Sequence, residues 1–137
     1  MILQTKYLDW ERKNIDNSIF KEVLQHFEKN EKLSQKSIIS LLLCSKKKIK
    51  QINKKYRFIN NYTDVISFPA HSKELLGDIV INLNEVDEVR GKTRRKKYLQ
   101  KLFIHGLLHL LDFDHFTKNG KIAMNVKEKN YHCLLNL

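Results

Sequence analysis

The segment HGLLHLLDFDH, from His105 to His115, constrains the fold more than any other part of the 137-residue chain. It continues a pattern that begins near Thr93, in which apolar residues recur with helical spacing. His105 and His109 are four residues apart, so a helix places their imidazoles one turn apart on the same side. We therefore predict a largely buried helix over about 93–111 that also presents two histidines together.

A third histidine follows at the spacing of a metal ligand. His115 lies ten residues after His105, and a helix that ends near Asp112 lets the chain reverse and bring His115 back. Asp tolerates the left-handed conformation that ends many helices. Three neutral imidazoles and one open position make a zinc site of the catalytic type. We predict that His105, His109 and His115 bind one zinc ion; the alternative is three core or helix-end histidines without a metal.

The spacing H-x3-H-x5-H matches that of the metzincin proteases, but two positions differ. Gly106 stands where those proteases have the glutamate that acts as general base, and Asp112 stands where they have a turn glycine. A glycine cannot take a proton from a bound water. The sequence therefore predicts the metal geometry without the peptidase machinery.

The charge of the chain favours a polyanionic partner. Its net charge is +11 and its isoelectric point is about 9.7. Two basic segments, SKKKIKQINKKYR (45–57) and RGKTRRKK (90–97), precede the two parts of the chain that carry the candidate site residues. If both segments line one cleft, they would follow an RNA backbone without reading its sequence. The alternative is a solubilising surface rich in lysine.

Composition limits the class of protein. With 42% apolar residues the chain can bury one core, so we expect a single domain over residues 1–137. There is no run of about 18 apolar residues, so we expect no membrane span. The N-terminus lacks the pattern of a secretory signal, and Cys44 and Cys133 are expected to be free thiols. These features predict a cytoplasmic protein.

The order of elements predicts an α+β fold with about four strands covered by helices. Apolar and β-branched runs predict strands over 37–44, 64–68 and 75–83, and a weak alternation predicts one over 2–8. Helical spacing predicts helices over 17–29, 46–57 and 93–111, with Ser45 as the cap of the second and a short piece after Asn84. The other histidines, His26, His71 and His132, show no ligand spacing and are interpreted as surface or packing residues.

Three blocks of the sequence together resemble the YbeY endoribonucleases, bacterial factors of ribosomal RNA maturation and ribosome quality control. HGLLHLLDFDH is similar to the family signature H-G-x-L-H-L-x-G-[YF]-D-H. INKKYRFINNYTDVISFP resembles L-N-x-x-Y-R…T-D-V-L-S-F-P, and GDIVIN resembles G-D-I-x-I-S. Order and spacing agree from about residue 38 to 116, whereas the first 35 residues carry nothing distinctive.

The resemblance implies a metal-dependent endoribonuclease that prefers single-stranded RNA, with the ribosome and its RNA as partners. By position it implies His105, His109 and His115 as the metal ligands and Arg57 as a functionally important arginine. It also implies a mixed four-stranded sheet packed on helices, with a zincin-like metal helix and the metal at one end of a cleft. Asp112 replaces the turn glycine of the family, so either Asp112 is left-handed or the turn differs.

The expected chemistry combines a metal with an arginine. Zinc lowers the pKa of bound water and polarises a phosphoryl oxygen. The planar guanidinium of Arg57 suits the scissile phosphate, unless Arg57 is a structural partner of a carboxylate such as Asp64. Asp114 either orients an imidazole or caps the turn. Three aromatic residues near Arg57 are candidates for base stacking: Tyr56, Phe58 and Tyr62. Phe68 is expected in the core.

Two other functions stay open at this point. One is a metal-dependent hydrolase of another ester or of a peptide bond. The other is a ribosome- or RNA-binding accessory protein whose metal is structural, which a nearby Cys133 would favour because structural zinc sites have four protein ligands. The sequence indicates neither the oligomeric state nor the attacking nucleophile.

Overall fold

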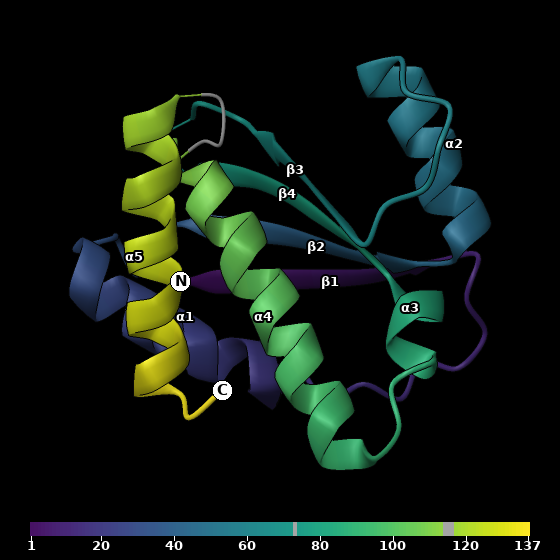
Figure 1. Cartoon of the computed structure of the whole chain (residues 1–137), viewed down its shortest axis with the longest axis horizontal. Helices are drawn as coiled ribbons and strands as arrows, with labels where there is room; N and C mark the ends of the chain where they lie inside the picture. The colour runs from purple at the N-terminus through teal and green to yellow at the C-terminus, as the bar shows by residue number, and fades with distance from the viewer. Residues whose placement is uncertain (73, 114–116) are drawn as a thin grey trace.

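The computed structural model describes residues 1–72, 74–113 and 117–137, and in these ranges the chain forms four strands and five helices (Figure 1). The strands are β1 (Ile2–Leu8), β2 (Ile38–Cys44), β3 (Val65–Pro69) and β4 (Leu75–Asn82). The helices are α1 (Ser18–Glu31), α2 (Lys46–Arg57), α3 (Leu83–Asp87), α4 (Lys92–Leu110) and α5 (Lys118–Leu134). Every element expected from the sequence is present within one to two residues, and α5 is an addition.

The strands form one mixed sheet in the order β1-β2-β4-β3. β1 pairs with β2, and β2 with β4, in parallel, whereas β3 pairs with β4 antiparallel and forms one edge of the sheet. This arrangement confirms the α+β class and the mixed four-stranded sheet. The zincin-like character expected of α4 stays a prediction.

The main core lies between one face of the sheet and α1, α4 and α5. Ile79 and Ile81 of β4 point to this face, and both are fully buried. Phe20 of α1 meets Phe103 of α4 edge to face with ring centroids 5.0 Å apart. Phe27 of α1 stacks on Tyr131 of α5 at 3.9 Å, so α5 closes the same core. In Figure 1, α4 crosses in front of the strands and α5 runs beside it.

The opposite face of the sheet carries α2. Because neighbouring residues of a strand point to opposite faces, Val80 lies on the other side from Ile79 and Ile81, where it packs with Ile49 of α2. The start of α2 is fixed as expected, since the hydroxyl of Ser45 accepts a hydrogen bond of 3.1 Å from the Lys48 N–H. Helices α2 and α4 therefore lie on opposite faces of the sheet.

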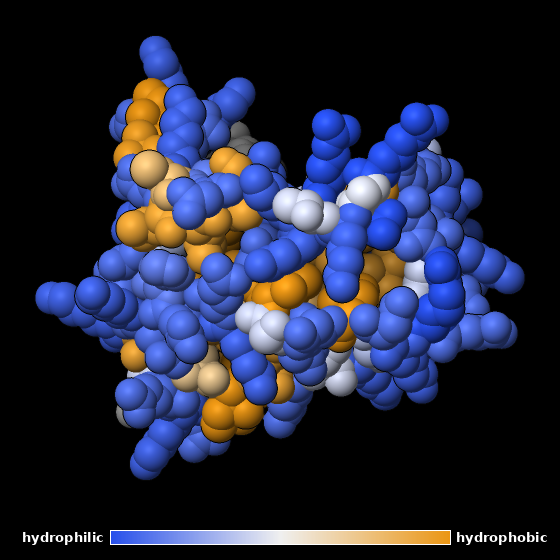
Figure 2. Space-filling view, turned by 90° about the horizontal axis from the view of Figure 1, so that it is seen from below, coloured by the Kyte–Doolittle hydropathy of each residue, from blue (hydrophilic) through white to orange (hydrophobic). Residues whose placement is uncertain are grey.

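The two cysteines are free thiols, as expected. Cys44 is buried at the end of β2, and burial raises the pKa of its thiol to about 12, whereas Cys133 is exposed on α5. Within the described ranges no helix has the length and apolar character needed to cross a membrane. Figure 2 shows a face of the molecule that is mostly hydrophilic and interrupted by separate hydrophobic areas.

Candidate metal-binding site

Gly106 brings α4 into close contact with the sheet between the two histidines. A Cβ atom built on Gly106 would lie 2.8 Å from Cγ2 of Ile79 and 3.1 Å from the hydroxyl of Ser67. The Ser67 hydroxyl also donates a hydrogen bond of 2.9 Å to the Gly106 carbonyl. The glycine therefore has a packing role, which explains why no larger residue, such as a glutamate, fits at this position.

The two described histidines converge as predicted. Nε2 of His105 and Nε2 of His109 are 3.2 Å apart, and the two rings are inclined by 74°. Tetrahedral zinc with Zn–N bonds of about 2.0–2.1 Å has ligand atoms about 3.3 Å apart. The same pair of nitrogens can share a proton in one hydrogen bond when no cation is present. The separation therefore fits two imidazoles that face a common cation.

Glu128 of α5 fixes the orientation of one ring. Its Oε1 lies 2.9 Å from Nδ1 of His105, and the side chains of His105 and Glu128 are only 30% and 22% exposed. When Nδ1–H donates to the carboxylate, Nε2 of His105 keeps its lone pair for a cation. This is the arrangement by which a carboxylate supports a metal-binding histidine.

The chain turns out of α4 at Asp112 in the left-handed conformation, one of the two possibilities that the sequence leaves open. Asp112 has a φ of 68°, which confirms the left-handed conformation. The Asp112 N–H donates to the His109 carbonyl and the Phe113 N–H donates to the Leu108 carbonyl, both at 3.1 Å. These two bonds form a Schellman motif. An aspartate therefore ends the helix where the signature has a glycine.

The third predicted ligand, His115, is not among the residues that the structure describes. His115 and its neighbour Asp114 lie outside the described residues, so both of their predicted roles stay predictions. Among residues 1–72, 74–113 and 117–137, no three His, Cys, Asp or Glu side chains are grouped as a metal site. The described chain thus places two of the three predicted ligands together, with the carboxylate of Glu128 beside one of them.

Arg57 is the last residue of α2 and is exposed. It lies on the α2 face of the sheet, whereas the histidines belong to the helix on the other face. The proposed structural partner, Asp64, accepts a hydrogen bond of 2.8 Å from the Val65 N–H instead. In the described part of the chain no ion pair joins Asp64 to Arg57, which leaves the guanidinium available for a phosphate.

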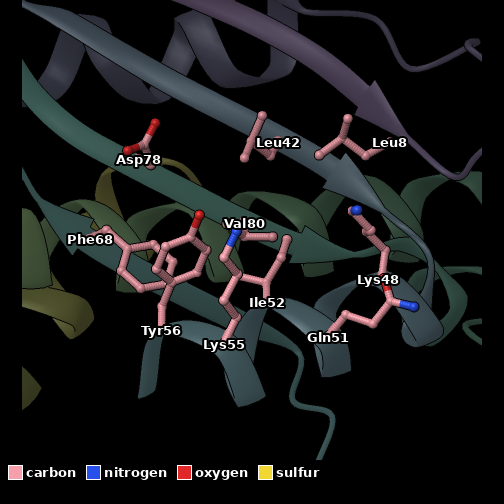
Figure 3. A pocket seen from close by; sticks show the side chains of 10 residues that line it. All are labelled: Leu8, Leu42, Lys48, Gln51, Ile52, Lys55, Tyr56, Phe68, Asp78 and Val80. Atoms are coloured by element: carbon pink, nitrogen blue, oxygen red, sulfur yellow. The ribbon is translucent and has the colours of Figure 1, made fainter. Parts of the chain in front are cut away.

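A cavity of about 590 Å³ opens between α2 and the sheet (Figure 3). Figure 3 shows Lys48 and Lys55 on the α2 side of the cavity, with Leu8 and Leu42 of the strands on the other side. The first basic segment therefore borders a cleft. Neither His105 nor His109 lines this cavity.

The second basic segment, residues 90–97, lies at the end of α4 that is far from the histidines. It forms the turn before α4 and the first turns of that helix. Lys92 and His105 are 13 residues apart along α4, or about 20 Å at 1.5 Å per residue. The two segments therefore do not border one cleft around the histidines.

Sequence reasoning missed Glu128, because it predicted no helix after residue 116. The available signal was helical spacing: Met124, Glu128 and Tyr131 share one side of α5, and Met124 and Tyr131 are buried. A carboxylate on an otherwise buried stripe requires a partner. That pattern could have marked both the helix and the residue.

Comparisons with known proteins show what this chain is similar to. A family model described as Endoribonuclease YbeY matches residues 4–136. The Endoribonuclease YbeY of Aliarcobacter butzleri is 40% identical over 97 residues, which cover 66% of this chain and 69% of the relative. That of Pelagibacter ubique is 38% identical over 116 residues, or 77% of this chain and 76% of the relative.

A solved structure shares the fold. The solution structure of TM1509 from Thermotoga maritima is similar with a TM-score of 0.57 at 23% sequence identity, over 95% of this chain and 86% of the other. At that identity the likeness concerns the fold alone. The family model covers nearly the whole chain, and it confirms the resemblance drawn from the histidine, arginine and strand motifs. The chain belongs to the YbeY endoribonuclease family.

Proposed function

We propose that this chain is a zinc-dependent endoribonuclease that cleaves single-stranded segments of ribosomal RNA during maturation and quality control of ribosomes in the cytoplasm. Its metal ligands are His105, His109 and His115, and Arg57 binds the scissile phosphate. The observation that carries the proposal is the 3.2 Å separation of the two Nε2 atoms, with Glu128 behind one ring. Membership of an endoribonuclease family supports RNA as the substrate.

The described residues suit such a centre. A bound zinc ion supplies a Lewis acid that stabilises charge on a phosphoryl oxygen and lowers the pKa of water. Glu128 holds the Nδ1 proton of His105, so that the Nε2 lone pair of that ring faces His109. Ser67 and Gly106 tie this part of α4 to the edge strand β3, which limits movement of both rings.

Arg57 supplies charge at the other side of the edge strand. Its guanidinium is permanently charged, and its planar fork of donors matches phosphate oxygens. The helix that carries it has seven basic residues and no acidic one. An RNA strand laid across β3 would have Arg57 on the α2 side of its scissile phosphate and the histidines on the α4 side. The same cations account for binding without sequence preference.

The test combines metal analysis with cleavage of a labelled single-stranded RNA. The purified parent protein is expected to hold about one zinc per chain and to cleave the RNA. His109→Ala should lose both properties. Arg57→Ala should keep the metal and lose at least about 100-fold in rate, because a cation at the transition-state charge contributes on that scale. Lys36→Ala, which removes an exposed cation that precedes β2 and lies outside α2, is the control and should cleave as the parent does.

Two outcomes would favour the other functions. If a peptide or another ester is cleaved while a phosphodiester is not, the centre serves a different hydrolase. If the parent shows no turnover and the His→Ala variants bind RNA and the ribosome normally, the protein is an accessory factor with a structural metal. Cleavage by Arg57→Ala at the rate of the parent would refute the role given to Arg57.

A further inference from the structure

The exposed aromatic side chains of this protein are concentrated in one short segment. Among the described residues, the aromatic side chains that count as exposed are Tyr56, Phe58 and Tyr62, at 59%, 90% and 42%. All three lie where α2 ends and the chain turns toward β3. Exposed apolar side chains that lie singly need no explanation, but three exposed aromatic residues within seven positions of one segment point to an interaction surface.

Of these three aromatic residues, Phe58 contributes least to the stability of the folded chain. It follows α2 in the left-handed conformation, with φ 59° and ψ 27°. A residue with a Cβ atom is strained there relative to glycine. Its ring is 90% exposed, so folding does not recover that strain through burial. Folding therefore does not explain a bulky aromatic residue at this position, whereas contact with a binding partner does.

The segment is ordered by Asn53, which is 3% exposed inside α2. The Asn53 carbonyl accepts hydrogen bonds from the N–H groups of Phe58 and Ile59. Its side-chain amide donates a hydrogen bond of 3.0 Å to the Asn61 carbonyl. The turn thus holds Phe58 in place before any ligand binds, which reduces the entropy lost on binding.

Lysines at the two ends of α2 lie over two of these rings. Nζ of Lys46 lies 3.8 Å from the ring centroid of Tyr62, and Nζ of Lys55 lies 5.2 Å from that of Tyr56. Tyr56 also meets Phe68 at the edge of the cavity, with ring centroids 5.7 Å apart (Figure 3). Exposed aromatic faces beside a row of cations are the combination that binds single-stranded nucleic acid without sequence preference.

We propose that the turn after α2 is a stacking platform for unpaired RNA bases, in which the Phe58 ring contacts a base and the cations of α2 hold the flanking phosphates. The inference rests on the proposed function, because it assigns to that function a site that grips the strand away from the histidines. An acidic protein surface would meet the same cations, but it offers no planar face for the ring of Phe58.

The test compares Phe58→Gly with the parent on two fluorescent probes. One probe is a single-stranded oligouridine of about ten nucleotides, and the other is the same sugar-phosphate strand without bases; both are checked for cleavage afterwards. Stacking contributes about 1–3 kcal/mol per base, so Phe58→Gly should bind the oligouridine roughly 5- to 150-fold more weakly. It should bind the abasic strand as the parent does. Phe58→Trp should keep the affinity of the parent.

The glycine variant also contains its own folding control. Glycine suits the left-handed position, so the urea midpoint of Phe58→Gly should equal or exceed that of the parent. Unchanged affinity for the oligouridine, or equal weakening on both probes, would overturn the stacking role. So would displacement of oligouridine by polyglutamate at the same charge concentration, which would indicate an acidic protein partner. If the parent still cleaves RNA in any of these cases, the proposed function stands and only the platform fails.

Discussion

Replacing Glu128 tests whether the His105 ring is supported for metal binding. The carboxylate is 22% exposed and lies 2.9 Å from Nδ1 of His105. Loss of a partner in this position costs about 10- to 100-fold in metal affinity, or about 1.4–2.7 kcal/mol. Glu128→Gln keeps an acceptor but loses the charge, and a charge-assisted bond is roughly twice as strong as a neutral one. We expect zinc to bind about 10-fold more weakly to Glu128→Gln, and closer to 100-fold more weakly to Glu128→Ala.

The assay is competition for zinc against a chromogenic chelator at neutral pH, which needs no catalytic turnover. Glu88→Gln removes the same charge from an exposed acidic residue that follows α3, and it should bind zinc as the parent does. Urea unfolding of each protein in the absence of metal shows whether α5 still packs. If Glu128→Gln and Glu128→Ala both bind zinc within twofold of the parent, the carboxylate does not support the metal and the reasoning is refuted.

Three further predictions concern the frame of the site. Asp112→Gly should raise the free energy of unfolding by up to about 1 kcal/mol in urea, because glycine adopts the left-handed φ of 68° without strain; a loss of stability would contradict the Schellman geometry. Gly106→Ala should lower that free energy by about 1–2 kcal/mol and weaken zinc binding, because its Cβ atom would lie 2.8 Å from the buried Ile79; stability equal to the parent would show that the contact relaxes freely. Burial lowers the pKa of His132; Lys101 is a smaller cause in the same direction, and Glu128 opposes both. The unfolded chain therefore binds a proton at His132 more readily than the folded one, and the free energy of unfolding should fall as the pH drops below about 6.5. His132→Gln should show a smaller fall, and a fall equal to that of the parent would contradict this assignment.

Much of the fold follows from local patterns in the sequence. The strand over 38–44 is an uninterrupted apolar run, and the spacing of Ile49 and Ile52 marks the buried side of α2. Such signals depend only on neighbouring residues, so the sequence alone reveals them. The pairing of His105 with His109 belongs to the same class, because i and i+4 on a helix must meet.

Other features depend on contacts that no local pattern encodes. α5 has few buried residues among many charged ones, and it is fixed by the stacking of Tyr131 on Phe27, more than 100 residues away. Glu128 meets His105 only because α5 packs there. The second basic segment lies far from the histidines for a related reason: the two are close in sequence, but the length of α4 separates them.

The coordination of zinc in the purified protein tests the central claim most directly. X-ray absorption at the zinc edge reports the number and kind of ligand atoms around the metal. We predict three imidazole nitrogens at about 2.0–2.1 Å and one oxygen from solvent. Sulfur from Cys133, a fourth protein nitrogen, or a protein that binds no zinc at neutral pH would contradict an open three-histidine centre.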